Sequence, residues 1–216
     1  MCFSAEADLV AGLVISGIGV DTVRHVRRAS ERPLAALPVV FGVHQLIEAG
    51  LWRGLEGYGP VGLWRGAMIA YLVIAFGVLP VLVPLAVGAL ESSAHRARVR
   101  SLTVLGAAVA AVLLYALARG PVDASIDGLH IAYRVDLWHG GPLVAIYVLV
   151  TCGSLLLSEH AHVRRFGALN LAAVLVLAWL DQRALISVWC AWAAVTSAAI
   201  AIHLRRSPSP EPVPAA

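Results

Sequence analysis

The chain contains no lysine, and only 13% of its 216 residues are charged. A soluble domain of this size is about half apolar and carries about a quarter charged residues. Here 60% of the residues are hydrophobic, and the mean hydropathy is +0.82. Surface-to-volume scaling prevents a water-surrounded globule of this size from burying so much apolar surface. The composition therefore excludes an ordinary soluble enzyme and a disordered chain.

Other features that the sequence lacks exclude further classes of protein. The three cysteines are too few for a disulfide scaffold, and without lysine no retinal Schiff base can form. The period-two alternation of an outer-membrane barrel is absent. No basic residue precedes the first apolar stretch, so we expect no cleaved signal peptide. The sequence predicts one all-α integral membrane domain.

Seven apolar stretches are candidates for membrane-spanning helices, since a helix needs roughly 20 apolar residues to cross the hydrocarbon core. They are residues 8–23, 34–55, 63–90, 102–118, 142–157, 166–180 and 185–204. We therefore expect a seven-helix transmembrane domain over residues 1–206. Residues 207–216 read SPSPEPVPAA, and this proline-rich segment is predicted to be a disordered cytoplasmic tail.

The arginines predict the orientation. Eleven of the 16 basic residues lie in alternate linkers and at the end of the last stretch: Arg24, Arg27, Arg28, Arg32, Arg96, Arg98, Arg100, Arg164, Arg165, Arg205 and Arg206. The positive-inside rule makes this side cytoplasmic. We expect a bacterial inner-membrane (plasma-membrane) protein with the N-terminus outside and the C-terminus in the cytoplasm. Arginines facing anionic lipid explain the net charge of +3, so no nucleic-acid partner is predicted.

The second apolar stretch contains His44 and Glu48, which share a helix face because they are four residues apart. A carboxylate at this depth costs about 2.5 kcal/mol or more unless it is paired or wetted, so Glu48 should face the interior of the bundle. The two side chains are our candidate catalytic residues, as a general base and its partner. A hydrogen-bond network that fixes helix register is the structural alternative.

The N-terminal residues offer a cap and a thiol. Ser4 is predicted to cap the first helix, with Glu6 or Asp8 in its first turn. Cys2 is a candidate metal ligand, redox group or acyl acceptor, and its alternative is an inert apolar cysteine.

The long outer segment between the fourth and fifth stretches contains Asp127 and His130. Their spacing is that of one helical turn, on which a carboxylate could orient an imidazole; a solvated loop is the alternative. Thiolate, imidazole and carboxylate are ligands of zinc and other divalent transition metals. The predicted metal ligands are Cys2, His44, Glu48 and His130.

Polar residues near the cytoplasmic side are predicted to be structural. Ser158, His160 and His162 are expected in a solvated loop at the membrane surface. Asn170 is expected to bridge two helices, and Cys152 to pack as a small apolar side chain.

Four segments resemble an uncharacterised family of bacterial, largely actinobacterial, multi-pass membrane proteins that begin Met-Cys-Phe-Ser. They are Met1-Cys2-Phe3-Ser4-Ala5, the stripe Gln45, Glu48 and Trp52, the run Ser158-Glu159-His160, and Ser187-Val188-Trp189-Cys190. The resemblance implies a bacterial inner-membrane location and brings no activity.

Three classes of function fit these observations, and the last is a purely structural interaction protein whose tail after Arg206 recruits a cytoplasmic partner. The first is a membrane-embedded hydrolase or redox enzyme, with an outward-facing polar, metal-binding site and a lipid-like or small apolar substrate entering from the outer leaflet. The alternative is a non-enzymatic sensor, small-solute carrier or assembly factor whose buried polar groups hold the helices together.

Overall fold

The computed structural model describes residues 4–128, 130–137, 140–180 and 185–206, with side chains outside 177–191. Within them the helices are α1 (Ala5–Arg24), α2 (Arg32–Leu55), α3 (Val61–Val73), α4 (Leu79–Leu90), α5 (Ser93–Arg119), α6 (Gly140–Leu156), α7 (Ala161–Leu180) and α8 (Leu185–Arg206). A short 3-10 turn (Ala29–Glu31) leads into α2, and the strands are β1 (Val122–Asp127) and β2 (His130–Val135). The predicted N-cap is confirmed, because Ser4 Oγ accepts a hydrogen bond from the Ala7 amide at 3.2 Å.

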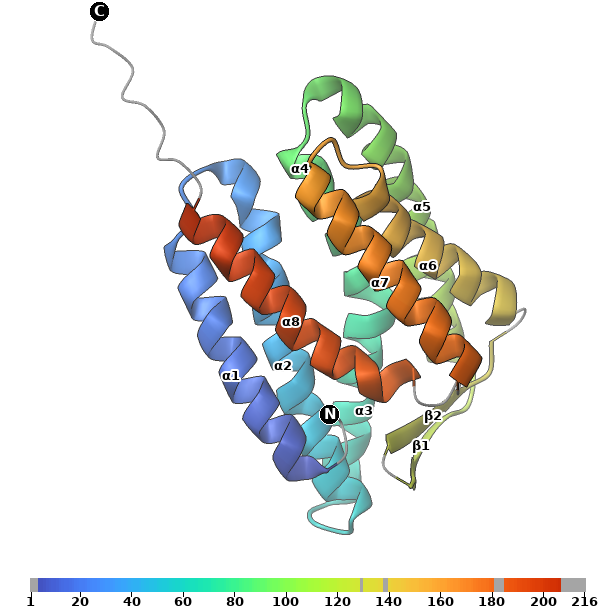
Figure 1. Ribbon diagram of the computed structural model, residues 1–216. Coiled ribbons are helices and arrows are strands. Elements are labelled where there is room, and N and C mark those ends of the chain that lie inside the picture. Colours follow the sequence, from blue (N-terminus) through green and yellow to red (C-terminus); the bar gives the residue numbers. More distant parts are fainter. Residues whose placement is uncertain (1–3, 129, 138–139, 181–184, 207–216) are drawn as a thin grey trace, which may run out of the picture.

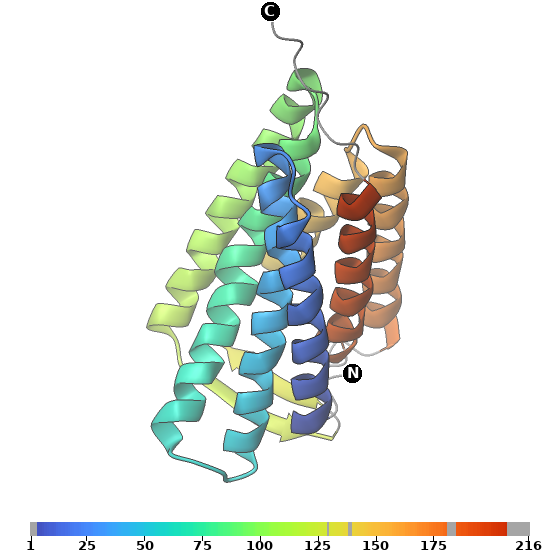
Figure 2. The same ribbon diagram turned by 90° about the vertical axis from the view of Figure 1, so that its left-hand side faces the viewer.

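The helices run up and down the molecule between two distinct ends (Figure 1). The α1–α2, α4–α5 and α6–α7 turns and the C-terminal end of α8 lie at one end, which we call the arginine-rich end. The α2–α3 turn and the strands lie at the other, which we call the hairpin end (Figure 2). The alternating linkers that carry the eleven arginines therefore gather on one side of the molecule.

Three described helices are long and apolar enough to cross a membrane: Ala29–Leu55, Val61–Leu90 and Ser93–Arg119. Gly140–Leu156 is a shorter apolar helix. A helical protein of membrane type is thereby confirmed, whereas seven membrane crossings and their orientation stay predictions.

Helix α3 continues into α4 through a π-helical turn, Ile74–Val78. Pro80 follows this turn and has no amide to donate to the carbonyl one turn earlier, which favours a locally widened helix. The Tyr147 hydroxyl of α6 donates a hydrogen bond to the Ala75 carbonyl at 2.9 Å. A backbone acceptor in the widened turn thus fixes α6 against the middle of this long helix.

Small residues bring α1 and α2 close together. A Cβ at Gly19 would lie 2.9 Å from the Val39 amide nitrogen, and one at Gly42 would lie 2.7 Å from that of Ser16. Larger residues cannot occupy these positions without moving the helices apart, so glycine permits the tight packing of this pair.

The prediction of an all-α chain is wrong between α5 and α6, where β1 and β2 form an antiparallel hairpin. Asp127 pairs with His130 across the hairpin instead of sharing a helical turn with it. Gly128 in the turn has a φ of 60°, a left-handed conformation that glycine adopts readily. Alternation along the strands buries Ala124 and Ile131 against the helices. The hairpin therefore closes one end of the core.

Buried apolar residues form a cluster in each half of the molecule. The cluster near the hairpin end includes Leu51, Trp52, Met68, Leu72, Leu117 and Ile131. The cluster toward the arginine-rich end includes Ile15, Leu37, Phe41, Leu79, Ile200 and Leu204. Polar groups interrupt the packing at both ends, and these are the candidate sites.

Candidate functional site

Glu48 and His44 are both buried, with exposed fractions of 1% and 6%. The expected inward orientation of Glu48 is confirmed. Its carboxylate accepts a hydrogen bond from the Tyr133 hydroxyl of β2 at 3.2 Å. The His44 ring stacks on Tyr71 of α3 with centroids 3.8 Å apart, and its Nε2 lies 3.2 Å from the Tyr71 carbonyl oxygen, to which it donates. The pair thus joins α2 to α3 and to the hairpin.

Asp8 of α1 belongs to the same polar network, although the sequence suggested for it only a favourable position in the first turn of the helix dipole. It is fully buried, and Gln45 Nε2 donates to its Oδ1 at 3.1 Å. Its Oδ2 has no hydrogen-bond partner within the described part of the chain. An acidic residue inside a predicted span was the signal that could have identified it.

Tyr133 connects the hairpin to this network. Its ring stacks on Tyr71 with centroids 4.8 Å apart. Burial raises the pKa of Tyr133 well above its usual range, and the nearby Tyr71 and Glu48 act in the same direction. The hydroxyl therefore stays protonated and serves as a donor to Glu48.

Cys2 and His130 are the other two predicted metal ligands. Cys2 lies outside the described residues. His130 begins β2, and its buried Nε2 has no hydrogen-bond partner in the described part of the chain. Among the described residues, His44, Glu48 and His130 do not form a set whose ligand atoms all lie within 4.8 Å of one another. The metal and catalytic roles of these residues stay predictions.

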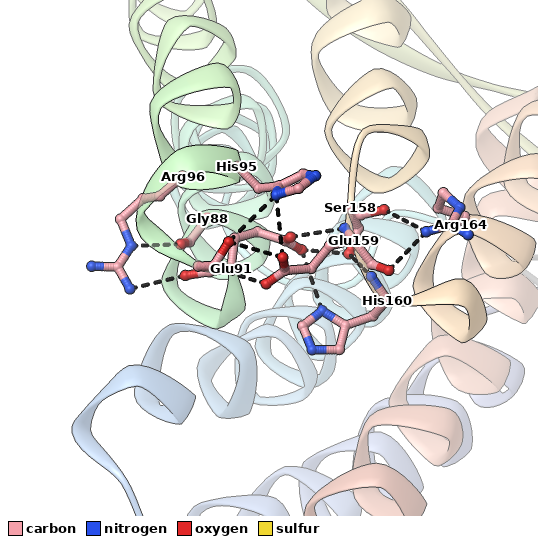
Figure 3. A network of polar contacts seen from close by, with 9 residues as sticks. Gly88, Glu91, His95, Arg96, Ser158, Glu159, His160 and Arg164 are labelled. Atoms are coloured by element: carbon pink, nitrogen blue, oxygen red, sulfur yellow. Dashed lines mark hydrogen bonds and ion pairs between the residues drawn. The ribbon is translucent and has the colours of Figure 1, made fainter.

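A second polar cluster lies at the arginine-rich end (Figure 3). Glu91 follows α4 and is 2% exposed. Its carboxylate accepts hydrogen bonds from the Ser158 hydroxyl and, at 2.8 Å, from the Glu159 amide. The Nδ1 atom of His160 lies 3.5 Å from the same carboxylate. An acid from the α4–α5 turn therefore holds the α6–α7 turn.

The α6–α7 turn in its turn supplies a carboxylate to the α4–α5 turn. Glu159 accepts hydrogen bonds from the amide and hydroxyl of Ser92, the N-cap of α5, at 2.7 and 2.8 Å. His95 Nδ1 lies 3.2 Å from the Glu159 carboxylate. The Ser92 amide and hydroxyl, followed by the charges of His95 and His160, lower the pKa of Glu159. Each turn thus supplies the carboxylate that satisfies donors of the other.

Two arginines complete the arrangement by binding carbonyl groups. Arg96 donates to the carbonyls of Gly88 and Glu91 at 3.2 and 3.0 Å. Arg164 donates to the carbonyls of Ser158 and Glu159 at 3.0 and 2.8 Å. These carbonyls belong to helix ends and turns that have no intrahelical donor for them. We call the eight residues the double clamp: Glu91, Ser92, His95, Arg96, Ser158, Glu159, His160 and Arg164.

The double clamp shows that Ser158 is not in a solvated loop, and it brings together side chains that could bind a metal ion. Ser158 is 2% exposed, so the predicted solvated loop is wrong at this residue. Among the described residues, one set of three His, Cys, Asp or Glu side chains has ligand atoms that all lie within 4.8 Å of one another. The set consists of Glu91, Glu159 and His160. Carboxylate oxygens and imidazole nitrogens bind divalent metals. The sequence analysis missed Glu91 because its partners are distant in the chain.

A cavity of about 690 Å³ lies between α2, α4, α6, α7 and α8. Its walls are largely aliphatic and aromatic, and include Leu37, Phe41, Leu79, Val83, Phe166 and Ile200. His162, Arg206 and His203 also line it. They come from the start of α7 and the end of α8, so the basic side chains sit at the arginine-rich end.

Asn170 and Trp192 line the cavity farther from that end and have buried polar atoms. Asn170 donates through Nδ2 to Cys152 Sγ at 3.4 Å, which confirms the predicted bridge between α7 and α6 and the burial of Cys152. The Asn170 Oδ1 and the Trp192 Nε1 are buried, and neither has a hydrogen-bond partner among the residues that the structure describes.

These features define a predominantly helical protein with helices of membrane-spanning length, polar clusters at both ends and a half-open apolar cavity between helices. The chain belongs to a family of unknown function, DUF6629, whose model matches residues 1–215. The expectation of an uncharacterised family is thereby confirmed, and its bacterial range stays a prediction. No curated protein and no solved structure matches the chain.

Proposed function

We propose that the protein is a bacterial inner-membrane protein in which seven helices cross the bilayer, with the N-terminus outside and the C-terminus in the cytoplasm. Three helices of spanning length support this proposal. The eleven arginines gathered at one end support the orientation, since basic residues are enriched in cytoplasmic loops. In this orientation the arginine-rich end, where α8 ends at Arg206, faces the cytoplasm. The predicted disordered tail, residues 207–216, lies outside the described residues.

We further infer that the protein binds a lipid-like molecule in the cavity. The observation that carries this inference is the cavity itself, because about 690 Å³ of space with apolar walls from five helices is typical of a small-molecule site. The cavity lies toward the arginine-rich end, so its ligand comes from the cytoplasmic leaflet. This differs from the outer-leaflet entry that the sequence suggested.

The chemistry of the walls favours binding over catalysis. No carboxylate and no cysteine occurs among the described residues that line the cavity. A hydrolase would need a nucleophile or an activated water with a general base at the ligand. The histidines of the lining, His162 and His203, lie at its arginine-rich end, and no carboxylate among the described lining residues orients them there. We therefore prefer the non-enzymatic alternative, a carrier or sensor of a lipid-like molecule.

A bulky residue in the cavity tests this proposal. Ala199 lines the cavity and the adjacent Ala198 does not, although both are exposed residues of α8. The variant Ala199→Trp should lose the lipid that the wild type retains after purification in mild detergent, as measured by native mass spectrometry. Ala198→Trp is the matched control and should retain it. Equal retention by wild type and Ala199→Trp, or no retained lipid at all, would contradict the proposal.

A second candidate function is metal binding, favoured by the close approach of Glu91, Glu159 and His160. Elemental analysis of purified protein tests it against the predicted outer site. Metal that is lost in Glu159→Gln and kept in Glu48→Gln assigns the ion to the double clamp, and the reverse pattern assigns it to the Glu48 network. A metal-free wild type would contradict both assignments.

A further inference from the structure

Three arginines at the hairpin end each lie over an aromatic ring. The guanidinium carbon is 5.4–5.7 Å from the ring centroid in each case, which is within the range of a cation–π contact. The end of α2, the start of α3 and the end of α5 supply the arginines, so all three lie opposite the arginine-rich end. We call them the three Arg–aromatic pairs: Arg53 with Tyr58, Arg65 with Trp64, and Arg119 with Tyr115.

The positive-inside rule does not explain these three arginines, because it favours basic residues on the cytoplasmic side. Acids within the described part of the chain account for Arg53, which pairs with Glu6 and lies 3.6 Å from Glu56. Arg65 and Arg119 form no ion pair with a described residue, and each lies over its ring instead. A ring covers one face of a guanidinium and leaves the N–H groups at its edge to donate to an oxyanion. An anionic group from outside the described chain is therefore the partner that their chemistry favours.

The spacing of arginines along two helices places the pairs one membrane thickness from the arginine-rich end. With a rise of about 1.5 Å per residue, Arg32 and Arg53 of α2 are about 31 Å apart along the helix axis. Arg100 and Arg119 of α5 are about 28 Å apart, and residues 101–118 between them carry no charge. The hydrocarbon core of a bilayer is about 30 Å thick. Each helix therefore brings an arginine to both surfaces of this core.

The α2–α3 turn, between Arg53 and Arg65, exposes apolar side chains. Tyr58, Val61 and Leu63 are 66%, 57% and 71% exposed. Exposed apolar surface of this kind is typical of a contact with a membrane or a partner. Tyrosine and tryptophan rings prefer the border between hydrocarbon and head groups, where one end of the ring is in an apolar environment and the other is wet. The composition of the turn thus favours the interfacial layer of a bilayer over bulk water.

We propose that the three Arg–aromatic pairs form a belt that binds the phosphates of outer-leaflet phospholipids and fixes the depth of the helices in the bilayer. This inference rests on the proposed membrane topology and adds a partner for its outer surface. The rings pack against the upper part of the acyl chains, and the guanidinium groups donate to the phosphate oxygens, which arginine can bind through two N–H groups at once. Phosphate is common to phospholipids, so the belt recognises this class of lipid and not one head group.

A spin label on α5 measures this depth. Val112 is 48% exposed and lies about two turns before Arg119, so a nitroxide attached to Val112→Cys follows the position of the helix end. Power saturation with oxygen and with a water-soluble nickel chelate gives the distance of the label from the membrane surface. The native cysteines are first replaced by alanine: Cys2, Cys152 and Cys190.

In phosphatidylcholine vesicles, Arg119→Gln should move the label toward the bilayer centre by about 2–5 Å, the rise of one to three residues. The helix end sinks because it has lost its contact with the phosphate. Tyr115→Leu keeps the charge but removes the ring beneath it, and it should shift the label in the same direction; an unchanged depth would overturn the role of the ring. Arg134→Gln is the matched control, because it removes an exposed arginine of β2 at the same end that lies over no described ring.

The outcomes separate the belt from the topology on which it rests. An unchanged depth in Arg119→Gln overturns the belt, and so does an equal shift in Arg134→Gln, since the total charge of the hairpin end then sets the depth. A shift that persists in vesicles of a phosphate-free glycolipid with the same acyl chains overturns phosphate as the partner. In all these results the wild-type label stays within the hydrocarbon core, and the topology stands. A wild-type label as accessible to the nickel chelate as in water overturns the topology together with the belt.

Discussion

Replacing Glu91 by leucine should destabilise the protein strongly, although leucine suits a membrane helix. Glu91 is 2% exposed and accepts hydrogen bonds from the Ser158 hydroxyl and the Glu159 amide. Leucine leaves both donors buried without an acceptor, at about 1–3 kcal/mol each. The substitution also removes the cost of burying a carboxylate, which offsets part of this loss. We therefore expect a net loss of about 2–3 kcal/mol.

Reversible unfolding in mixed micelles of mild detergent and increasing SDS, followed by tryptophan fluorescence, measures this loss. Glu56→Leu is the control, because Glu56 is a partly exposed acid at the hairpin end that lies 3.6 Å from Arg53. Exposed pairs contribute about 0–1 kcal/mol, so this variant should unfold almost like the wild type. A Glu91→Leu variant as stable as Glu56→Leu would refute the double clamp.

A double-mutant cycle separates the clamp from a general effect of the leucine. Ser158→Ala in the Glu91→Leu background removes one of the donors left without an acceptor. The double variant should therefore lose less stability than the sum of the two single variants, with a coupling of about 0.5–3 kcal/mol. Strict additivity would show that the two side chains do not interact in the membrane.

The remaining predictions concern pH and packing. Because the Ser92 amide and hydroxyl lower the pKa of Glu159 below its ordinary value of 4.5, its stabilising contribution is present above 4.5 and is lost as pH falls through the lower folded value. Glu159→Gln should flatten the acid side of the profile of Tm against pH, and an unchanged acid side would contradict this reasoning. Gly106→Val should destabilise by about 1–3 kcal/mol in the same unfolding assay, because a Cβ there lies 3.0 Å from the Pro80 carbonyl carbon. Gly66→Val, with nothing within 4 Å, should be neutral, and equal effects of the two valines would contradict the packing.

The burial of Glu48 could be predicted from sequence because an acid within a long apolar helix has one favourable direction. Its partner could not be predicted in the same way. Tyr133 lies 85 residues away, on a strand that the sequence analysis did not expect. Burial follows from local composition, whereas pairing depends on the tertiary arrangement.

The hairpin was missed although its signal is in the sequence. Gly128, directly after Asp127, is a residue favoured in hairpin turns, and the flanking segments alternate as strands do. The analysis looked for helical spacing between Asp127 and His130 because the rest of the chain is helical. A period of two on either side of Gly128 would have predicted β1 and β2.

Neither the double clamp nor the cavity could be derived from residue patterns. Glu91 and Ser158 are 67 residues apart, and each alone resembles an ordinary polar residue at the end of a helix. A cavity is space that side chains leave unfilled, and its volume depends on how five helices meet. The sequence predicted a lipid-like ligand, and the structure indicates where we propose that it binds.

The reciprocal contacts between the two turns also bear on biogenesis. During synthesis, the acid that follows α4 leaves the ribosome 67 residues before the serine that satisfies it. In the proposed membrane topology, the nascent chain carries this carboxylate without its serine and amide donors until the α6–α7 turn has been made. The α6–α7 turn supplies these donors together with the Glu159 carboxylate that binds Ser92, so a chain truncated before residue 158 should lose both halves of the double clamp at once.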